Sequence, residues 1–78
     1  MPKISAVDYR TLIRVFEMDG FPISRQKGDH IIMVKVGIPR PLVIKTSPHE
    51  VPVTHVRTNL TTAGMSRERY FELLDQAR

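Results

Sequence analysis

Hydrophobic and polar positions in the first twenty residues follow the period of a helix. Ser5 and Asp8 have the S-x-x-D form of a capping box, which predicts that the helix begins at Ser5. Gly20 predicts its end, in a left-handed backbone conformation. Between them, apolar side chains recur at i, i+3, i+4 and i+7 on one face: Tyr9, Leu12, Ile13 and Phe16.

The middle of the chain shows the patterns of strands. Residues 21–27 roughly alternate between apolar and polar, and Pro22 suits an edge strand because proline cannot donate to a ladder. Residues 28–29, Gly and Asp, predict a turn. Residues 30–36 are rich in Ile, Met and Val and predict a better-buried strand, and residues 42–46 predict a third, short one.

The last third of the chain returns to helical spacing. Residues 47–50 have the composition of a loop, and Pro52 lies near the first turn of a helix that ends at Gly64. This helix turns one set of residues inward: Val53, Val56, Leu60 and Ala63. Ser66 caps a short last helix with its own inward set: Tyr70, Leu73, Leu74 and Ala77.

This order of elements predicts an α+β domain of two layers, in which a three-stranded antiparallel sheet has its helices on one face. With 78 residues the chain has room for one domain, residues 1–78. The absence of cysteine excludes disulfides and a thiolate zinc site. No apolar run is long enough to span a bilayer, so we expect a cytoplasmic protein with no membrane association.

The net charge of the chain indicates which kind of molecule it could bind. Twelve Lys and Arg against eight Asp and Glu give a net charge of +4 and a pI near 10.0. A basic protein attracts polyanions such as nucleic acids, because binding releases their counterions. Charge alone does not distinguish a nucleic-acid-binding protein from other small basic proteins.

Residues 25–30, R-Q-K-G-D-H, bring two cations, a glycine turn and an imidazole together. Histidine ordinarily titrates near neutral pH, so His30 could take a proton from a ribose 2′-hydroxyl or give one to a leaving oxygen. Arg25 and Lys27 could hold the phosphate. The alternative is a plain hairpin turn with no chemistry.

Other candidates are more scattered. Lys27, Lys35, Arg40 and Lys45 could form a basic stripe over the sheet, or serve only to discourage edge pairing. His55 falls off the apolar face of its helix and is expected to be a surface residue. The spacing of the three histidines matches no usual zinc pattern, so we expect neither a metal site nor a cofactor.

Four segments together resemble the HicA/YcfA-like family of bacterial toxins. Members carry a Gly-Phe pair after the first helix, here residues 20–21, and an R-Q-K-G-[S/T]-H turn, here residues 25–30. An E-[I/V]-P segment matches residues 50–52, and an A-G-[L/I]-S-R-E segment matches residues 63–68. The resemblance covers nearly the whole chain.

This resemblance implies a fold similar to the double-stranded-RNA-binding domain, metal-independent cleavage of mRNA, and a cognate HicB-like antitoxin. The functional histidine of the family falls on His30, and His49 matches a loop position where members often carry histidine. The site is therefore expected to comprise His30 as the catalytic residue and these candidates for RNA contact: Arg25, Lys27, Gly28, Lys35, Lys45 and His49.

The chain departs from the family pattern at two positions. Asp29 replaces the usual Ser or Thr, and Ile31 replaces a second histidine that often follows. Asp29 could pair with Lys27 or Arg25, could orient the ring of His30, or could repel an approaching phosphate. We expect repulsion to prevail. A non-catalytic RNA-binding module and a protein-interaction module remain the alternatives to a ribonuclease.

Overall fold

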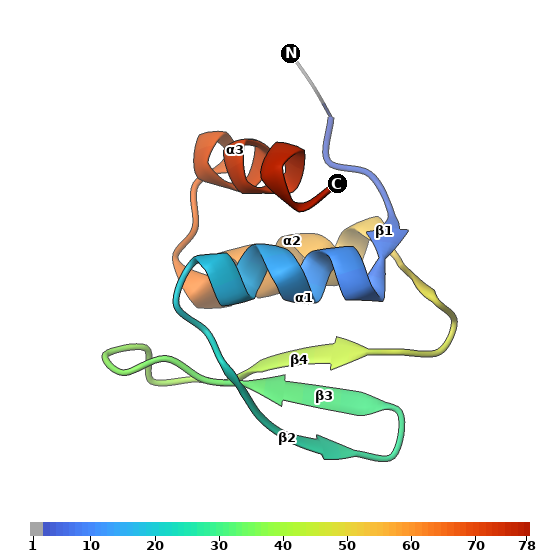
Figure 1. Ribbon diagram of the computed structural model, residues 1–78, viewed down its shortest axis with the longest axis vertical. Coiled ribbons are helices and arrows are strands. Elements are labelled where there is room, and N and C mark those ends of the chain that lie inside the picture. Colours follow the sequence, from blue (N-terminus) through green and yellow to red (C-terminus); the bar gives the residue numbers. More distant parts are fainter. Residues whose placement is uncertain (1–2) are drawn as a thin grey trace.

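The computed structural model describes residues 3–78, and its centre is an antiparallel sheet (Figure 1). Three strands lie in the order β2 (Ile23–Lys27), β3 (His30–Met33) and β4 (Leu42–Lys45). All the helices of the described chain lie on one side of this sheet, so the opposite face is open (Figure 1). The predicted two-layer α+β architecture is confirmed.

Two strands differ in detail from their predictions. β2 begins two residues later than expected, and all five of its residues are exposed rather than alternating. It is an edge strand, and the buried side chains of the sheet come from β3 and β4: Ile31, Met33, Leu42 and Ile44. β3 ends at Met33 instead of residue 36, because the chain then leaves the sheet for an exposed loop.

The first helix, α1 (Tyr9–Met18), begins later than predicted. Its N-cap is Asp8, whose carboxylate accepts a hydrogen bond from the backbone N–H of Arg10 at 2.9 Å. The predicted capping box at Ser5 is wrong, because the residues just before Tyr9 are extended. Gly20, with φ of +92°, follows the helix end in a left-handed conformation as predicted.

The extended start of the chain pairs with a segment expected to be a loop. β1 (Val7–Asp8) forms a second, two-stranded antiparallel sheet with β5 (Glu50–Val51). The backbone N–H of Tyr9 also donates to the carbonyl of His49 at 2.8 Å. These bonds hold the start of α1 beside the segment that leads into the next helix.

The remaining helices are α2 (Val53–Ala63) and α3 (Arg67–Ala77). α2 ends at Gly64, where φ is +68°, and α3 is capped by the Ser66 hydroxyl, which accepts from a backbone N–H. α3 has 11 residues, as many as α2, so it is not the short helix that was predicted. No helix among residues 3–78 is both long and apolar enough for a bilayer.

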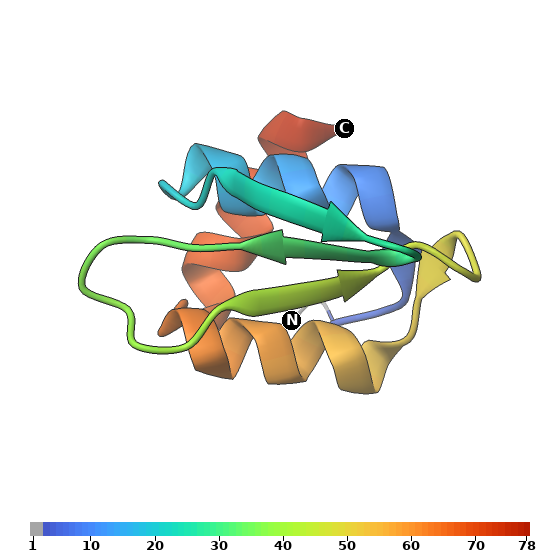
Figure 2. The same cartoon turned by 90° about the horizontal axis from the view of Figure 1, so that it is seen from below.

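The inward faces predicted from helical spacing form most of the core. Leu12, Ile13 and Phe16 of α1 are buried, while Tyr9 and Val53 pack at the edge of the core. α2 runs alongside the edge strand β4 (Figure 2). The later helices bury the residues expected: Val56, Leu60, Ala63, Tyr70, Leu73, Leu74 and Ala77.

Candidate active site

The open face of the sheet carries a row of side chains that includes His30. Strand register places His30 opposite Lys27 on β2 and opposite Lys45 on β4. Directly opposed residues of antiparallel strands project on the same face. Because the adjacent Ile31 and Ile44 are buried in the core, the row faces away from the helices.

The next row along the sheet adds a third cation to this face. Arg25 lies opposite Ile32, which lies opposite Val43. Neither Arg25 nor Lys27 forms an ion pair with any residue between 3 and 78. The open face therefore presents Arg25, Lys27 and Lys45 around the imidazole of His30.

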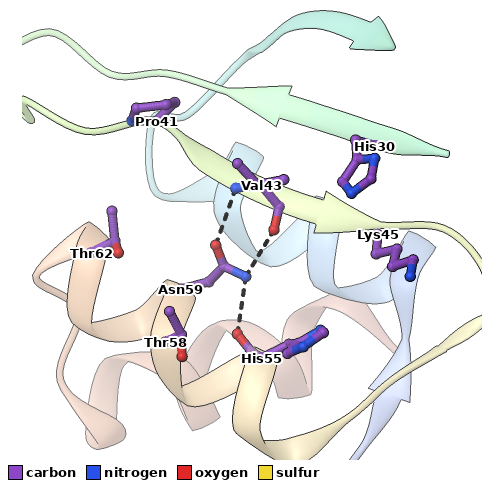
Figure 3. A pocket seen from close by; sticks show the side chains of 8 residues that line it. All are labelled: His30, Pro41, Val43, Lys45, His55, Thr58, Asn59 and Thr62. Atoms are coloured by element: carbon purple, nitrogen blue, oxygen red, sulfur yellow. Dashed lines mark hydrogen bonds between the residues drawn. The ribbon is translucent and has the colours of Figure 1, made fainter. Parts of the chain in front are cut away.

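A groove of about 250 Å³ borders this face, between β4 and α2 (Figure 3). His30, Lys45 and His55 gather at one end of it, and Pro41 and Thr62 lie at the other (Figure 3). Sheet and helix both contribute to its lining: His30, Pro41, Val43 and Lys45 from the sheet side, and His55, Thr58, Asn59 and Thr62 from α2. The imidazole of His30 is about half exposed, so a ligand in the groove can reach it.

Asp29 lies against the ring of His30. The Nδ1 atom of His30 lies 2.9 Å from the Oδ1 atom of Asp29, the distance of an ion pair when the ring is protonated. The carboxylate therefore stands beside Nδ1, and Nε2 is the ring nitrogen away from this contact. Of the two pairings that the sequence left open for Asp29, the structure contains the one with His30 and not an ion pair with Arg25 or Lys27.

The turn that carries this pair is itself held against β4. The carbonyl of Asp29 accepts from the backbone N–H of Thr46 at 2.8 Å and from its hydroxyl at 3.2 Å. Gly28 has φ of +59°, a conformation that favours glycine and that lets the chain reverse before His30. The backbone at Asp29 is therefore held by bonds from Thr46, the residue that follows β4, and not by the turn alone.

Asn59 fixes the other wall of the groove. It is buried, and its amide bonds both backbone groups of Val43: Oδ1 accepts from the N–H, and Nδ2 donates to the carbonyl, each at 3.2 Å. Nδ2 also donates to the carbonyl of His55 at 3.0 Å (Figure 3). These bonds give partners to both backbone groups of Val43 on the outer edge of β4, and they hold α2 beside that strand.

Sequence reasoning missed this helical wall. His55 was expected to be a surface residue, and it is exposed, yet it lines the groove. The signal was present as a polar stripe at i, i+3, i+4 and i+7, beside the apolar stripe of the same helix: His55, Thr58, Asn59 and Thr62. A buried amide on such a stripe indicates contact with another element.

Two predicted RNA contacts lie away from the groove. The Lys35 ammonium donates to the carbonyl of Asp19 at 2.9 Å and lies 5.4 Å from the centre of the Phe21 ring, so it serves the end of α1. His49 lies in the loop before β5, and its ring centre is 5.9 Å from that of Tyr9. Gly28 occupies the tip of the β2–β3 turn and contributes only backbone.

The described residues include no group of three or more His, Cys, Asp or Glu placed to hold a metal ion.

A comparison with protein families shows which family the chain belongs to. The family model for the HicA toxin of bacterial toxin–antitoxin systems matches residues 9–65, which run from α1 to the end of the groove-lining helix and include His30. The chain belongs to the HicA toxin family. It is thus related to the toxin component of a toxin–antitoxin system. No curated protein and no solved structure matches significantly, so the likeness to a double-stranded-RNA-binding domain stays a prediction.

Proposed function

We propose that this HicA-family protein is an endoribonuclease that cleaves mRNA without a metal ion and uses His30 as its catalytic residue. One arrangement carries the proposal. His30 lies 2.9 Å from Asp29, it lines a groove, and it stands in a row with two lysines on an uncovered face.

The chemistry follows from the position of Asp29. With the carboxylate beside Nδ1, Nε2 takes the proton from a ribose 2′-hydroxyl, and the 2′-oxygen then attacks the adjacent phosphorus. Asp29 stabilises the imidazolium that forms, as the carboxylate does in a Ser-His-Asp triad. The P–O5′ bond breaks, leaving a 2′,3′-cyclic phosphate on one fragment and a 5′-hydroxyl on the other.

The cations around His30 would bind the RNA backbone and offset its negative charge. Lys45 lines the groove beside His30, where its ammonium would hold the non-bridging oxygens as negative charge develops on them. Lys27 and Arg25 lie farther out on the same face and would hold neighbouring phosphates of a single RNA strand. Contacts of this kind position the backbone and read no sequence.

An antitoxin would act by covering this face. The face is basic, and it contains both His30 and the groove, so a HicB-like protein with an acidic surface would bind it and exclude RNA. Co-expression of such a partner should therefore protect cells from the protein.

A second candidate function is RNA binding without cleavage. Asp29 favours it, because its carboxylate places negative charge beside the position that a phosphate would occupy. The basic face and the groove would serve either function.

Induction of the chain in bacteria without any partner tests the proposal. Wild type should arrest growth and deplete full-length mRNA, and His30→Ala should do neither at equal expression. Arg57→Gln is the matched control, because Arg57 is an exposed cation of α2 that lines a different hollow. Arrest by both wild type and His30→Ala would contradict the role of His30, and RNA binding without arrest would establish the second candidate.

A further inference from the structure

We propose that His55 is a second catalytic residue of the groove, the general acid that protonates the leaving 5′-oxygen. This inference rests on the proposed ribonuclease function and adds a group that the His30 mechanism lacks. It starts from a need of the reaction: when the P–O5′ bond breaks, the departing oxygen must receive a proton, and His30 has just taken one from the 2′-hydroxyl.

The groove places His55 where such an acid is needed. His30 projects from β3 on the sheet side, and His55 projects from the first turn of α2 on the opposite wall (Figure 3). Both lie at the same end of the groove, with Lys45 beside them (Figure 3). A phosphate held by Lys45 would have one imidazole on each side, which suits in-line displacement with attack and departure on opposite faces of phosphorus.

The chemistry of the available groups selects His55 for this role. The titratable side chains that line the groove are His30, Lys45 and His55, and Asp29 lies against His30. An ammonium ordinarily holds its proton too tightly near neutral pH to be an effective acid there, whereas imidazole ordinarily titrates in that range. With His30 serving as base, His55 is the remaining imidazole.

The backbone that carries His55 is joined to the sheet by Asn59. Nδ2 of Asn59 donates to the carbonyl of His55 and to the carbonyl of Val43 in β4, so one buried amide joins the backbone that carries His55 to the sheet that carries His30. The two imidazoles therefore project from elements that this amide connects. A solvated histidine on a free helix surface would have no such connection.

The two steps balance without any further reactant. In the first, the 2′-oxygen forms a bond to phosphorus as its proton passes to Nε2 of His30. In the second, the P–O5′ bond breaks and the proton of the His55 imidazolium passes to the 5′-oxygen. No electrons are transferred, and exchange of protons with water restores both rings.

The test uses a leaving group that needs no acid. We would compare cleavage of a short RNA with cleavage of the same RNA carrying sulfur in place of the bridging 5′-oxygen at the bond that wild type cuts, because a thiolate leaves without protonation. His55→Gln should slow cleavage of the ordinary RNA by about 10² or more, the usual contribution of a general acid. On the sulfur substrate its rate should return to near that of wild type.

The controls separate catalysis from folding and binding. His30→Gln should stay slow on both substrates, because loss of the base is not rescued by a better leaving group. Arg57→Gln, on the same helix, should match wild type on both. Equal slowing of His55→Gln on both substrates, or no slowing on either, would overturn the role of His55 while leaving the proposed ribonuclease in place. Failure of wild type to cleave any RNA would instead overturn the ribonuclease function, and this inference with it.

Discussion

The contact between Asp29 and His30 determines what the imidazole can do. From sequence, the acidic replacement of the family's usual hydroxyl was expected chiefly to repel phosphate. The 2.9 Å separation gives Asp29 another role in the proposed mechanism, because a carboxylate beside Nδ1 stabilises the imidazolium and leaves Nε2 for the substrate. Sequence could name both residues, but neighbouring side chains can point in different directions, so it could not establish the contact.

Asp29→Ser tests this role. We expect kcat for RNA cleavage to fall, since the imidazolium loses its partner, but by less than the factor of about 10² or more that loss of the base itself would cost. The KM for RNA should stay the same or fall, because a negative charge has been removed. Steady-state kinetics on a defined RNA would measure both. A rise in kcat would show instead that the repulsion expected from sequence dominates.

Tyr70 is a residue whose hydroxyl has no role in the core. The side chain is fully buried, and among residues 3–78 no group forms a hydrogen bond with its hydroxyl. Burial raises the pKa of Tyr70 above its ordinary value of 10.0, because the phenolate would lose its hydration. Its contribution to packing was predicted from helical spacing, whereas its unpaired hydroxyl could not be.

This pKa shift predicts a dependence of stability on pH. The unfolded protein ionises Tyr70 more readily than the folded protein, so the free energy of unfolding should fall as pH rises above about 10. Tyr70→Phe should lose less stability over that range and should be at least as stable as wild type at pH 7, since it removes an unpaired buried group. Urea denaturation at pH 7 and at pH 10.5–11.5 measures both, and parallel losses in the two proteins would contradict the assignment.

At the scale of elements, the sequence predicted the helices and strands better than their ends. Helical spacing identified the inward faces of α1, α2 and α3, because core burial imposes that period. It placed the start of α1 at Ser5, because local capping patterns cannot reveal that the preceding residues pair with a strand more than forty positions away. For the same reason Val7 and Asp8 of β1 were expected to be helical, and Glu50 of β5 was expected to be loop.

Asn59 joins a helix to a strand, and helical spacing alone did not reveal this. On the outer edge of β4, where no further strand pairs, its amide bonds both the N–H and the carbonyl of Val43. An amide side chain can do this because it carries a donor and an acceptor together. Asn59 therefore links the two walls of the groove directly.

Asn59→Leu should lower the free energy of unfolding by about 2 kcal/mol, because the backbone groups of Val43 lose their partners and each buried unpaired group costs about 1–3 kcal/mol. Thr61→Leu, an exposed substitution on the same helix, should change it by less than about 0.5 kcal/mol. Chemical denaturation of the three proteins measures the difference. Equal stability of Asn59→Leu and wild type would show that these bonds do not hold α2 to the sheet.

At the scale of the whole molecule, one face carries the features that suit RNA. A domain of this size covers one side of its sheet with helices and leaves the other open, and here the open side carries Arg25, Lys27, His30 and Lys45. The sequence predicted these four as site residues. It did not predict that α2 would supply a second wall, because that depends on how the helix packs beside β4.

The net charge of +4 indicates a binding surface only where its cations lie free on one face. Lys35 was expected to join the basic face, but its ammonium bonds the end of α1 instead. Counting charges along the sequence could not separate a cation used for packing from one free to meet a phosphate.

The central claim is that His30 cleaves RNA in this groove without a metal ion. Its most direct test is the initial rate of cleavage of a defined RNA by purified protein in excess EDTA, compared among wild type, His30→Ala and Arg57→Gln. Wild type and Arg57→Gln should cleave equally, leaving 2′,3′-cyclic phosphate ends, and His30→Ala should be slower by about 10² or more. Equal rates in wild type and His30→Ala, or cleavage that requires an added divalent ion, would contradict the account.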